Sequence, residues 1–383
     1  METTVPDARL NSYFDSQQDA MLDLLKQLVD MDSPTDNRDL VNRLGDFIVD
    51  ELRSQGATVT LDEQTERGNH VLGTFGSGDR KPVLMIGHMD TVWPAGTAFE
   101  RRFQSEGDVA RGPGSFDMKA GLVIMLFALR AANALQLRFP RPLRLLFNSD
   151  EEQRSEFSRD LILREARNSG YALVFEGAPD VAEITTSRKA SGRFTVTAIG
   201  KAAHAGADIE KGVNAIEELA YQIPVLQRMT DLEIGTTVSV GVITGGTRPN
   251  VVPARAEIQL SVRAATAAEM KRISDAIRRL KPVLPGASLE ISGDFHRGPY
   301  EPNPGNQQLF ERLRDAARPI GLELRGRQAG GASDANLTSS VGTPTLDGLG
   351  GVGSGAHSLD ERITPSSLPV RANLVTRLLL SLE

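Results

Sequence analysis

Short, almost continuous apolar runs in the first half of the chain constrain its fold more than any other feature. Residues 82–86 (PVLMI), 143–147 (LRLLF) and 172–175 (ALVF) each have the length of a buried strand. Residues 16–31 and 117–132 instead carry apolar side chains at helical spacing. Strands that are apolar on both faces and alternate with helices are typical of a parallel sheet covered on both sides. The sequence therefore predicts an α/β domain with a mixed, mostly parallel sheet flanked by helices.

The pattern changes near residue 190. The following segments predict strand, helix, strand, strand, helix and strand in turn: 193–199, 213–228, 237–243, 257–262, 267–280 and 288–292. This β-α-β-β-α-β order is that of a ferredoxin-like unit. The helix–strand pattern of the first half resumes after residue 298 and ends in a helix predicted from about Pro365. We expect a discontinuous α/β domain at 1–188 and 299–383, with an α+β domain inserted at 189–298.

Charge and hydropathy restrict the partners of the chain. The 383 residues carry a net charge of −7, which disfavours nucleic acid and anionic membranes as main partners. The densest apolar stretch, residues 121–129, is much shorter than the roughly 20 residues that cross a bilayer. The N-terminus (METTVPDARLNSYFDSQQ) lacks a basic start and an apolar core, so no signal peptide is predicted and a cytoplasmic location is favoured. A leader removed earlier would leave the same sequence.

The chain contains no cysteine, which excludes disulfides, thiolate ligands and cysteine nucleophiles. Any metal must therefore be held by nitrogen and oxygen, a donor set that suits zinc, cobalt or manganese. No GxGxxG turn follows the first strand, so a nucleotide-dependent oxidoreductase on a similar sheet is disfavoured.

Two polar motifs could carry chemistry in the first half of the chain. GHMDTV follows the first buried strand, and the carboxyl ends of strands are where open α/β sheets place their sites. Asp90 could accept the second imidazole N–H of His88, or it could merely cap a surface turn. In GPGSFDMKAG, Asp117 stands where a helix begins, so it could cap that helix or bridge two cations.

Acidic residues and a histidine stand at the ends of further elements. FNSDEEQRS places three carboxylates in succession, ending with Glu151 and Glu152, and their repulsion is costly unless a cation or solvent relieves it. One of the pair could bind metal while the other moves protons; a solvated acidic loop is the alternative. Glu176 ends the next strand in FEGAP, and the Gly-rich GSGAHSLDE presents His357. These positions can converge on one edge of the sheet.

Eight motifs, taken together and in order, resemble the M20 family of zinc-dependent metallopeptidases. They are GHMDTV, GPGSFDMKAG, NSDEE, FEG, KAAHAGA, NVVPARAEIQLSVR, GGASDA and the final histidine loop. The likeness covers nearly the whole chain and is greatest to the bacterial glutamate carboxypeptidase (carboxypeptidase G2-like) branch.

The resemblance implies two Zn²⁺ per subunit, with Co²⁺ or Mn²⁺ as alternatives. In this family's pattern, His88 and Glu176 would hold one ion. Glu152 and His357 would hold the other, and Asp117 would bridge both.

The resemblance also implies the roles of the residues beside these ligands. Asp90 would orient the His88 imidazole, and Glu151 would act as the general base and then the general acid. The bond Asp117–Met118 is implied to be a cis peptide.

The inserted domain is implied to be a lid and a homodimer interface. His204, in KAAHAGA, would reach the partner subunit's site and help to stabilise the oxyanion. Asn250, Arg263 and Arg297 would bind the substrate carboxylate, and Ser333 would lie beside the site.

Three positions depart from the usual family pattern and leave the substrate open. Arg154 and Ala120 replace glycines that are common in the family, and Gly298 stands where proline often follows the arginine. We expect cleavage of an amide or peptide bond next to a C-terminal amino acid in a small peptide. The alternative is an N-acyl-amino-acid amidohydrolase or deacetylase, and the alternative of another class is a catalytically silent, metal-dependent binding protein.

Overall fold

The computed structural model describes residues 7–383, which form two compact units. The first contains the chain up to Thr186 together with Pro302–Gln328 and Ser333–Glu383. The second contains Ser187–Glu301 and the short return segment Ala329–Ala332, which the sequence did not indicate.

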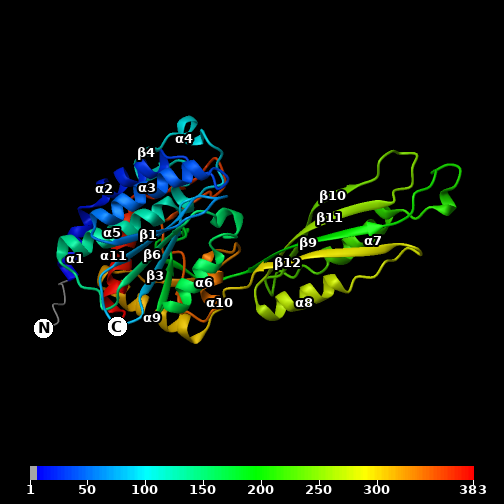
Figure 1. Ribbon diagram of the computed structural model, residues 1–383. Helices are drawn as coiled ribbons and strands as arrows, with labels where there is room; N and C mark the ends of the chain where they lie inside the picture. Colours follow the sequence, from blue (N-terminus) through cyan, green and yellow to red (C-terminus); the bar gives the residue numbers. More distant parts are fainter. Residues whose placement is uncertain (1–6) are drawn as a thin grey trace. The chain divides into compact units, whose positions relative to one another are not determined.

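The first unit is built on a six-stranded sheet of order β1-β2-β6-β3-β7-β14; β1, β6 and β3 of this sheet are labelled in Figure 1. Four of its strands pair in parallel: β6 (Leu143–Asn148), β3 (Val83–His88), β7 (Tyr171–Val174) and β14 (Thr345–Leu346). Two pair antiparallel at one edge: β2 (His70–Phe75) and β1 (Thr58–Asp62). The expected mixed, mostly parallel sheet is confirmed.

The burial of β3 explains why this strand lacks any polar alternation. Val83 and Met85 belong to the main core, whereas Leu84 and Ile86 point to the opposite face and are equally buried. Both faces must therefore be covered, as in other parallel sheets. The helices of this unit are α1 (Asp7–Asp15), α2 (Gln18–Val29), α3 (Arg38–Ser54), α4 (Thr97–Glu100), α5 (Ala120–Leu135), α6 (Arg159–Asn168), α9 (Pro304–Ala317), α10 (Asp334–Ser340) and α11 (Ser367–Ser381).

Two smaller sheets contain further strands. One has the order β15-β16-β5-β4, formed by Gly353–Ser354, Arg362–Ile363, Val109–Arg111 and Gln104–Glu106. The other pairs β13 (Arg325–Ala329) with β8 (Glu183–Arg188).

The most apolar helix is longer than the sequence suggested. A π-helical turn, Ser115–Lys119, continues directly into α5, so that Ser115–Leu135 is long and apolar enough to cross a membrane. The expectation of a far shorter apolar stretch is wrong in this respect. Of its most apolar window, 83% is buried inside the protein, as in the central helix of a folded core. Within residues 7–383 no other helix passes the same test.

The second unit has the predicted β-α-β-β-α-β order. Its elements are β9 (Ala190–Ile199), α7 (Ala215–Gln227), β10 (Thr237–Gly245), β11 (Arg255–Ala264), α8 (Ala267–Arg278) and β12 (Ser288–Arg297). The strands form an antiparallel sheet of order β10-β11-β9-β12. Alternate residues of β11 are buried in one cluster with residues of both helices, so α7 and α8 cover the same face. Helices therefore cover one face of this sheet, which is typical of antiparallel strands whose apolar and polar residues alternate.

Gly121 fixes the distance between α5 and the end of β7. A Cβ placed at this residue would lie 2.1 Å from the backbone O of Phe175, directly before Glu176. We predict that Gly121→Ala destabilises the protein by about 1–3 kcal/mol, because the helix must move away from the strand. Urea denaturation measures this change.

Gly45→Ala in α3 is the matched control, since its Cβ would meet Val71 at an ordinary 3.6 Å. It should be neutral or stabilising by up to about 1 kcal/mol, because alanine favours helix. Equal effects of the two substitutions would contradict the steric explanation.

Candidate metal centre

The topology of the main sheet brings three parts of the centre together. Strand β3 ends at His88, which is paired with Asn148 at the end of the neighbouring strand β6. The acidic residues Glu151 and Glu152 follow β6, and Glu176 follows β7 on the other side of β3. Because these strands are parallel neighbours, their carboxyl ends meet at one edge, where α/β sheets place their sites.

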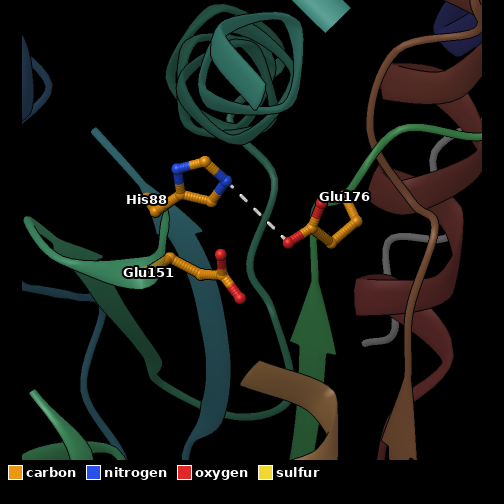
Figure 2. Close-up of side chains that lie close together, drawn as sticks. All are labelled: His88, Glu151 and Glu176. Atoms are coloured by element: carbon orange, nitrogen blue, oxygen red, sulfur yellow. Dashed lines mark ion pairs between the residues drawn. The ribbon is translucent and has the colours of Figure 1, made fainter. Parts of the chain in front are cut away.

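His88 is the centre of one group of side chains. Its Nε2 lies 3.1 Å from Oδ1 of Asp117 and 3.9 Å from Oε1 of Glu176. The side chains of His88, Glu151 and Glu176 point into a common space, and their donor atoms lie within 4.8 Å of one another (Figure 2). Such a group has the size of a coordination sphere for one cation.

His357 completes a second group on the other side of Asp117. Its Nε2 lies 3.2 Å from Oδ2 of Asp117 and 3.0 Å from Oε2 of Glu152. The two carboxylate oxygens of Asp117 thus each face one imidazole, His88 through Oδ1 and His357 through Oδ2. A carboxylate placed in this way can bridge two cations.

The electrostatics of the cluster favour added positive charge. Burial lowers the pKa of His88, but hydrogen bonds to Asp117 and Asp90 outweigh it and raise that pKa well above its usual range. Hydrogen bonds to Asp117 and Glu152 raise the pKa of His357 to about 10. Burial and the Asp117 charge raise the pKa of Glu152 to about 8. Closely spaced carboxylates therefore stabilise cations at this edge.

The donor set fits metal ions of the zinc type. Oε1 of Glu152 is buried and has no hydrogen-bond partner among the residues that the structure describes. A buried carboxylate oxygen is costly unless a hydrogen bond or a cation compensates for it. Imidazole nitrogens and carboxylate oxygens without thiolates suit zinc, cobalt or manganese.

Asp90 holds the acidic loop as well as the histidine. Its carboxylate accepts the backbone N–H groups of Glu151 at 3.1 Å and Glu152 at 3.2 Å, and the hydroxyl of Thr35 at 2.7 Å. Nδ1 of His88 lies 3.0 Å from the backbone O of Asp90 and 3.4 Å from its carboxylate. Asp90 therefore links the histidine to the loop that follows β6.

Ser333 has a clear local role in the first unit. Its buried hydroxyl donates to Asp347 at 2.7 Å and accepts the N–H of Ala335 at 3.1 Å, so it caps helix α10. Its suggested place beside the substrate stays a prediction.

Four predicted residues lie in the second unit, outside the cluster of the first. Nδ1 of the exposed His204 accepts N–H groups from Gly206 and Ala207 at 3.1 Å each. The exposed Asn250 pairs its backbone O with the N–H of Ala205 at 3.0 Å, next to that histidine. Arg263 is half-buried on β11, and Arg297 is buried at the end of β12.

The sequence did not select Glu361, which is fully buried and four residues after His357. Its carboxylate accepts the backbone N–H of Asp117 at 3.1 Å. The only available signal was an acidic residue in the same Gly-rich loop as the histidine.

Local backbone geometry agrees with two expectations about family positions. The Asp117–Met118 peptide is cis, as the resemblance implied. Arg154 has φ of 76°, in the left-handed region that favours glycine, so glycine would fit this turn with less strain. Ala120 is fully buried, and a Cβ placed at Gly351 would lie 2.5 Å from the Cβ of Ala120.

An α/β sheet whose carboxyl edge gathers imidazoles around a shared carboxylate is the framework of a metallohydrolase. The chain belongs to the peptidase family M20/M25/M40, whose family model matches residues 84–381. The predicted membership of the M20 metallopeptidases is thereby confirmed.

Individual relatives agree with this assignment. The chain is 30% identical to carboxypeptidase G2 of Pseudomonas sp. strain RS-16, over 96% of this chain and 90% of that protein. Aminopeptidase PepT of Bacillus cereus has a similar fold, with a TM-score of 0.78 at 22% identity, covering 95% of this chain and 98% of that one. A dinuclear metal-binding M20 peptidase of Bacillus subtilis superposes with a TM-score of 0.70 at 15% identity, covering 96% and 98%. At these identities the two structures show a shared fold.

Divalent metal should stabilise this protein through the cluster. At a zinc concentration about 100-fold above Kd, one site contributes about 2.7 kcal/mol to folding, so thermal unfolding should shift to higher temperature. Asp117→Asn should lose most of that shift, because Asp117 faces both histidines. Differential scanning calorimetry with and without zinc measures it.

Glu165→Gln is the matched control, since Glu165 pairs with Arg144 at 2.8 Å and is no part of the cluster. It should keep the full zinc-dependent shift. A shift that survives in Asp117→Asn would place the metal elsewhere.

Proposed function

We propose that this protein is a di-zinc hydrolase that cleaves the amide bond next to a C-terminal amino acid, in the manner of a glutamate carboxypeptidase. The observation that carries the proposal is the position of Asp117, which turns one carboxylate oxygen to each of two histidines. The 30% identity to carboxypeptidase G2 along almost the whole chain supports the substrate class.

In this proposal His88 and Glu176 hold one cation, Glu152 and His357 hold the other, and Asp117 bridges them. Bound there, two such cations would polarise the scissile carbonyl and lower the pKa of a bound water. Asp90 fixes the position of the His88 imidazole relative to the Glu152 loop, because it is hydrogen-bonded to both. Co²⁺ or Mn²⁺ would fit the same donors.

Glu151 is proposed as the proton carrier. It adjoins the proposed ligand Glu152, and its side chain points toward the space between His88 and Glu176 (Figure 2). A carboxylate there can take the proton of the attacking water and return it to the leaving amine. Asp90 fixes the Glu151 backbone by accepting its N–H at 3.1 Å.

The second unit is proposed to supply the groups that bind the rest of the substrate. Because Nδ1 of His204 accepts two backbone N–H groups, the proton of its neutral ring lies on Nε2. An Nε2–H donor is suited to stabilising a developing oxyanion. Arg263, Arg297 and Asn250 would bind the free carboxylate, for which arginine has the matching geometry.

A homodimer would bring His204 to a partner's site. Support comes from β10, which is an edge strand of the second unit's sheet and exposes Val242 and Ile243 at 47% and 55%. Exposed edge strands pair readily with another strand. Tyr221 and Val225 on α7 add exposed apolar surface to the same unit. A second copy of this chain is the proposed partner.

A substrate panel tests the reaction. Zinc-loaded protein should hydrolyse peptides that end in glutamate, or N-acyl-glutamates such as folate, and should fail on the same compounds with an amidated C-terminus. Preference for short N-acyl amino acids would instead favour the amidohydrolase alternative. Metal binding without any hydrolysis would favour a silent binding protein.

Glu151→Gln should lower kcat by about 10²- to 10⁴-fold, because the amide cannot carry the proton. The metal content of the variant should stay near that of the wild-type protein. Atomic emission spectroscopy measures this metal content on the same sample. Near-normal turnover with metal bound would show that Glu151 is not the base.

Subunit exchange tests the role of His204 in the partner's site. Equal amounts of inactive His204→Ala and inactive Glu151→Gln protein, mixed by reversible denaturation, should recover about a quarter of the normal activity. That is the statistical share, because half of the dimers are mixed and each contains one complete site. No recovery despite proven exchange would contradict action across the dimer.

A further inference from the structure

Glu361 is a fully buried carboxylate surrounded by N–H donors. Oε1 accepts the backbone N–H groups of Phe116 at 3.0 Å and Asp117 at 3.1 Å. Oε2 accepts the backbone N–H of Gly114 and the indole N–H of Trp93, each at 2.9 Å. With its oxygens occupied by these donors, the carboxylate binds the chain around the metal centre.

The Asp117 loop is shaped to receive this anion. Gly114 has φ of 72°, and its N–H points to the same carboxylate as those of Phe116 and Asp117. The N–H groups of Phe116 and Asp117 are consecutive, and consecutive N–H groups in a turn form an anion-binding concavity. Hydrogen bonds to an ionised carboxylate are stronger than neutral ones, so the loop is held firmly.

Glu361 connects three segments that are far apart in the sequence. Through Trp93 the Glu361 carboxylate holds the segment that follows His88. Through the backbone N–H of Asp117 it holds the Asp117 loop. Its own segment carries His357, and Arg101 tightens this arrangement by stacking on Trp93 and donating to the backbone O of Leu359 at 2.9 Å. One side chain thus fixes the spacing of the segments that carry the two histidines and Asp117.

We propose that Glu361 is a positioning residue for the metal centre, which sets Asp117 between His88 and His357. The inference rests on the proposed metal-binding function. It assigns no coordination and no proton transfer to Glu361; the residue acts through the backbone of the Asp117 loop.

Glutamine is the informative replacement. Its amide has one acceptor oxygen, while its NH₂ group would face two N–H donors. Glu361→Gln therefore loses either the bonds to Phe116 and Asp117 or those to Gly114 and Trp93. The volume of the side chain is nearly unchanged, so packing is little disturbed.

Glu218→Gln is the matched control. Glu218 is also fully buried and accepts the backbone N–H groups of Val283 at 3.0 Å and Leu284 at 2.8 Å, but it lies in the second unit. It has the same chemistry without a link to the metal ligands. A loss of metal affinity shared by both variants would be a general effect of replacing a buried carboxylate.

The experiment measures metal affinity in competition with a chelator, using Zn²⁺ and Co²⁺ alone. For Glu361→Gln we expect affinity at least about ten-fold lower, as for other partners of metal ligands, and an altered visible spectrum of the Co²⁺ form. Glu218→Gln should stay within about two-fold of the unchanged protein. A smaller difference between the two variants overturns the proposal.

Trp93 gives a readout that needs no metal, because it is the only tryptophan in the chain. Its emission should shift in metal-free Glu361→Gln, and its response to Zn²⁺ should weaken, whereas Glu218→Gln should keep both. Unchanged emission and response overturn the proposal.

Glu361→Asp decides the question if the glutamine variant does not fold. Aspartate keeps the negative charge, but its side chain is one carbon shorter, so the carboxylate lies farther from the N–H donors. Metal affinity should therefore fall at least about three-fold. Metal affinity equal to that of the wild-type protein overturns the proposal.

The outcomes separate this inference from the proposed function. Normal hydrolysis and normal metal affinity in Glu361→Gln reject the positioning role alone. A protein that binds metal but hydrolyses no member of the panel rejects the function, while the affinity ratio still tests Glu361. A protein that binds no metal rejects both before any variant is made.

Discussion

The parallel pairing of β6, β3 and β7 is the constraint on which the proposed metal centre depends. Parallel neighbours end at the same edge, so residues that follow them in sequence are forced into one place. That edge receives His88, Glu152 and Glu176. Asp117 and His357 join them from loops, and burial together with the charge of Asp117 raises the pKa of Glu152 to about 8. The sheet thus brings together a set of side chains that a cation stabilises.

Two buried carboxylates hold this set in place without belonging to it. Asp90 accepts the N–H groups of the Glu151–Glu152 loop, and Glu361 accepts those of the Asp117 loop. Charge-assisted hydrogen bonds are roughly twice as strong as neutral ones, and bonds to backbone N–H groups act directly on the path of the chain. A precise ligand geometry can therefore be built on loops, because the loops are tied to acids in the interior.

Much of this could be predicted from the sequence, because the strongest signals are local. Unbroken apolar runs predicted the strands, and the polar residue directly after each run marked the sheet edge, as for His88 and Glu176. The alternation after residue 190 predicted the β-α-β-β-α-β unit for the same reason. Asp117 and His357 carried weaker local signals and gained weight only from the family resemblance.

What the sequence could not predict depends on contacts between distant segments. Trp93 and Glu361 are 268 positions apart, and no periodicity connects them. The hydrogen bond from Ser333 to Asp347 and the return of Ala329–Ala332 to the second unit both depend on the folded chain. The length of the apolar helix was underestimated because a π-helical turn with non-helical dihedral angles at Asp117 and Met118 extends it.

The most direct test of a two-metal centre at this sheet edge is an anomalous-diffraction measurement at the zinc absorption edge on crystals of the zinc-loaded protein. Two anomalous peaks are expected, one beside His88 and Glu176 and the other beside Glu152 and His357, with Asp117 contacting both. A single peak, or peaks away from these side chains, would contradict the claim that this sheet edge is a two-metal centre.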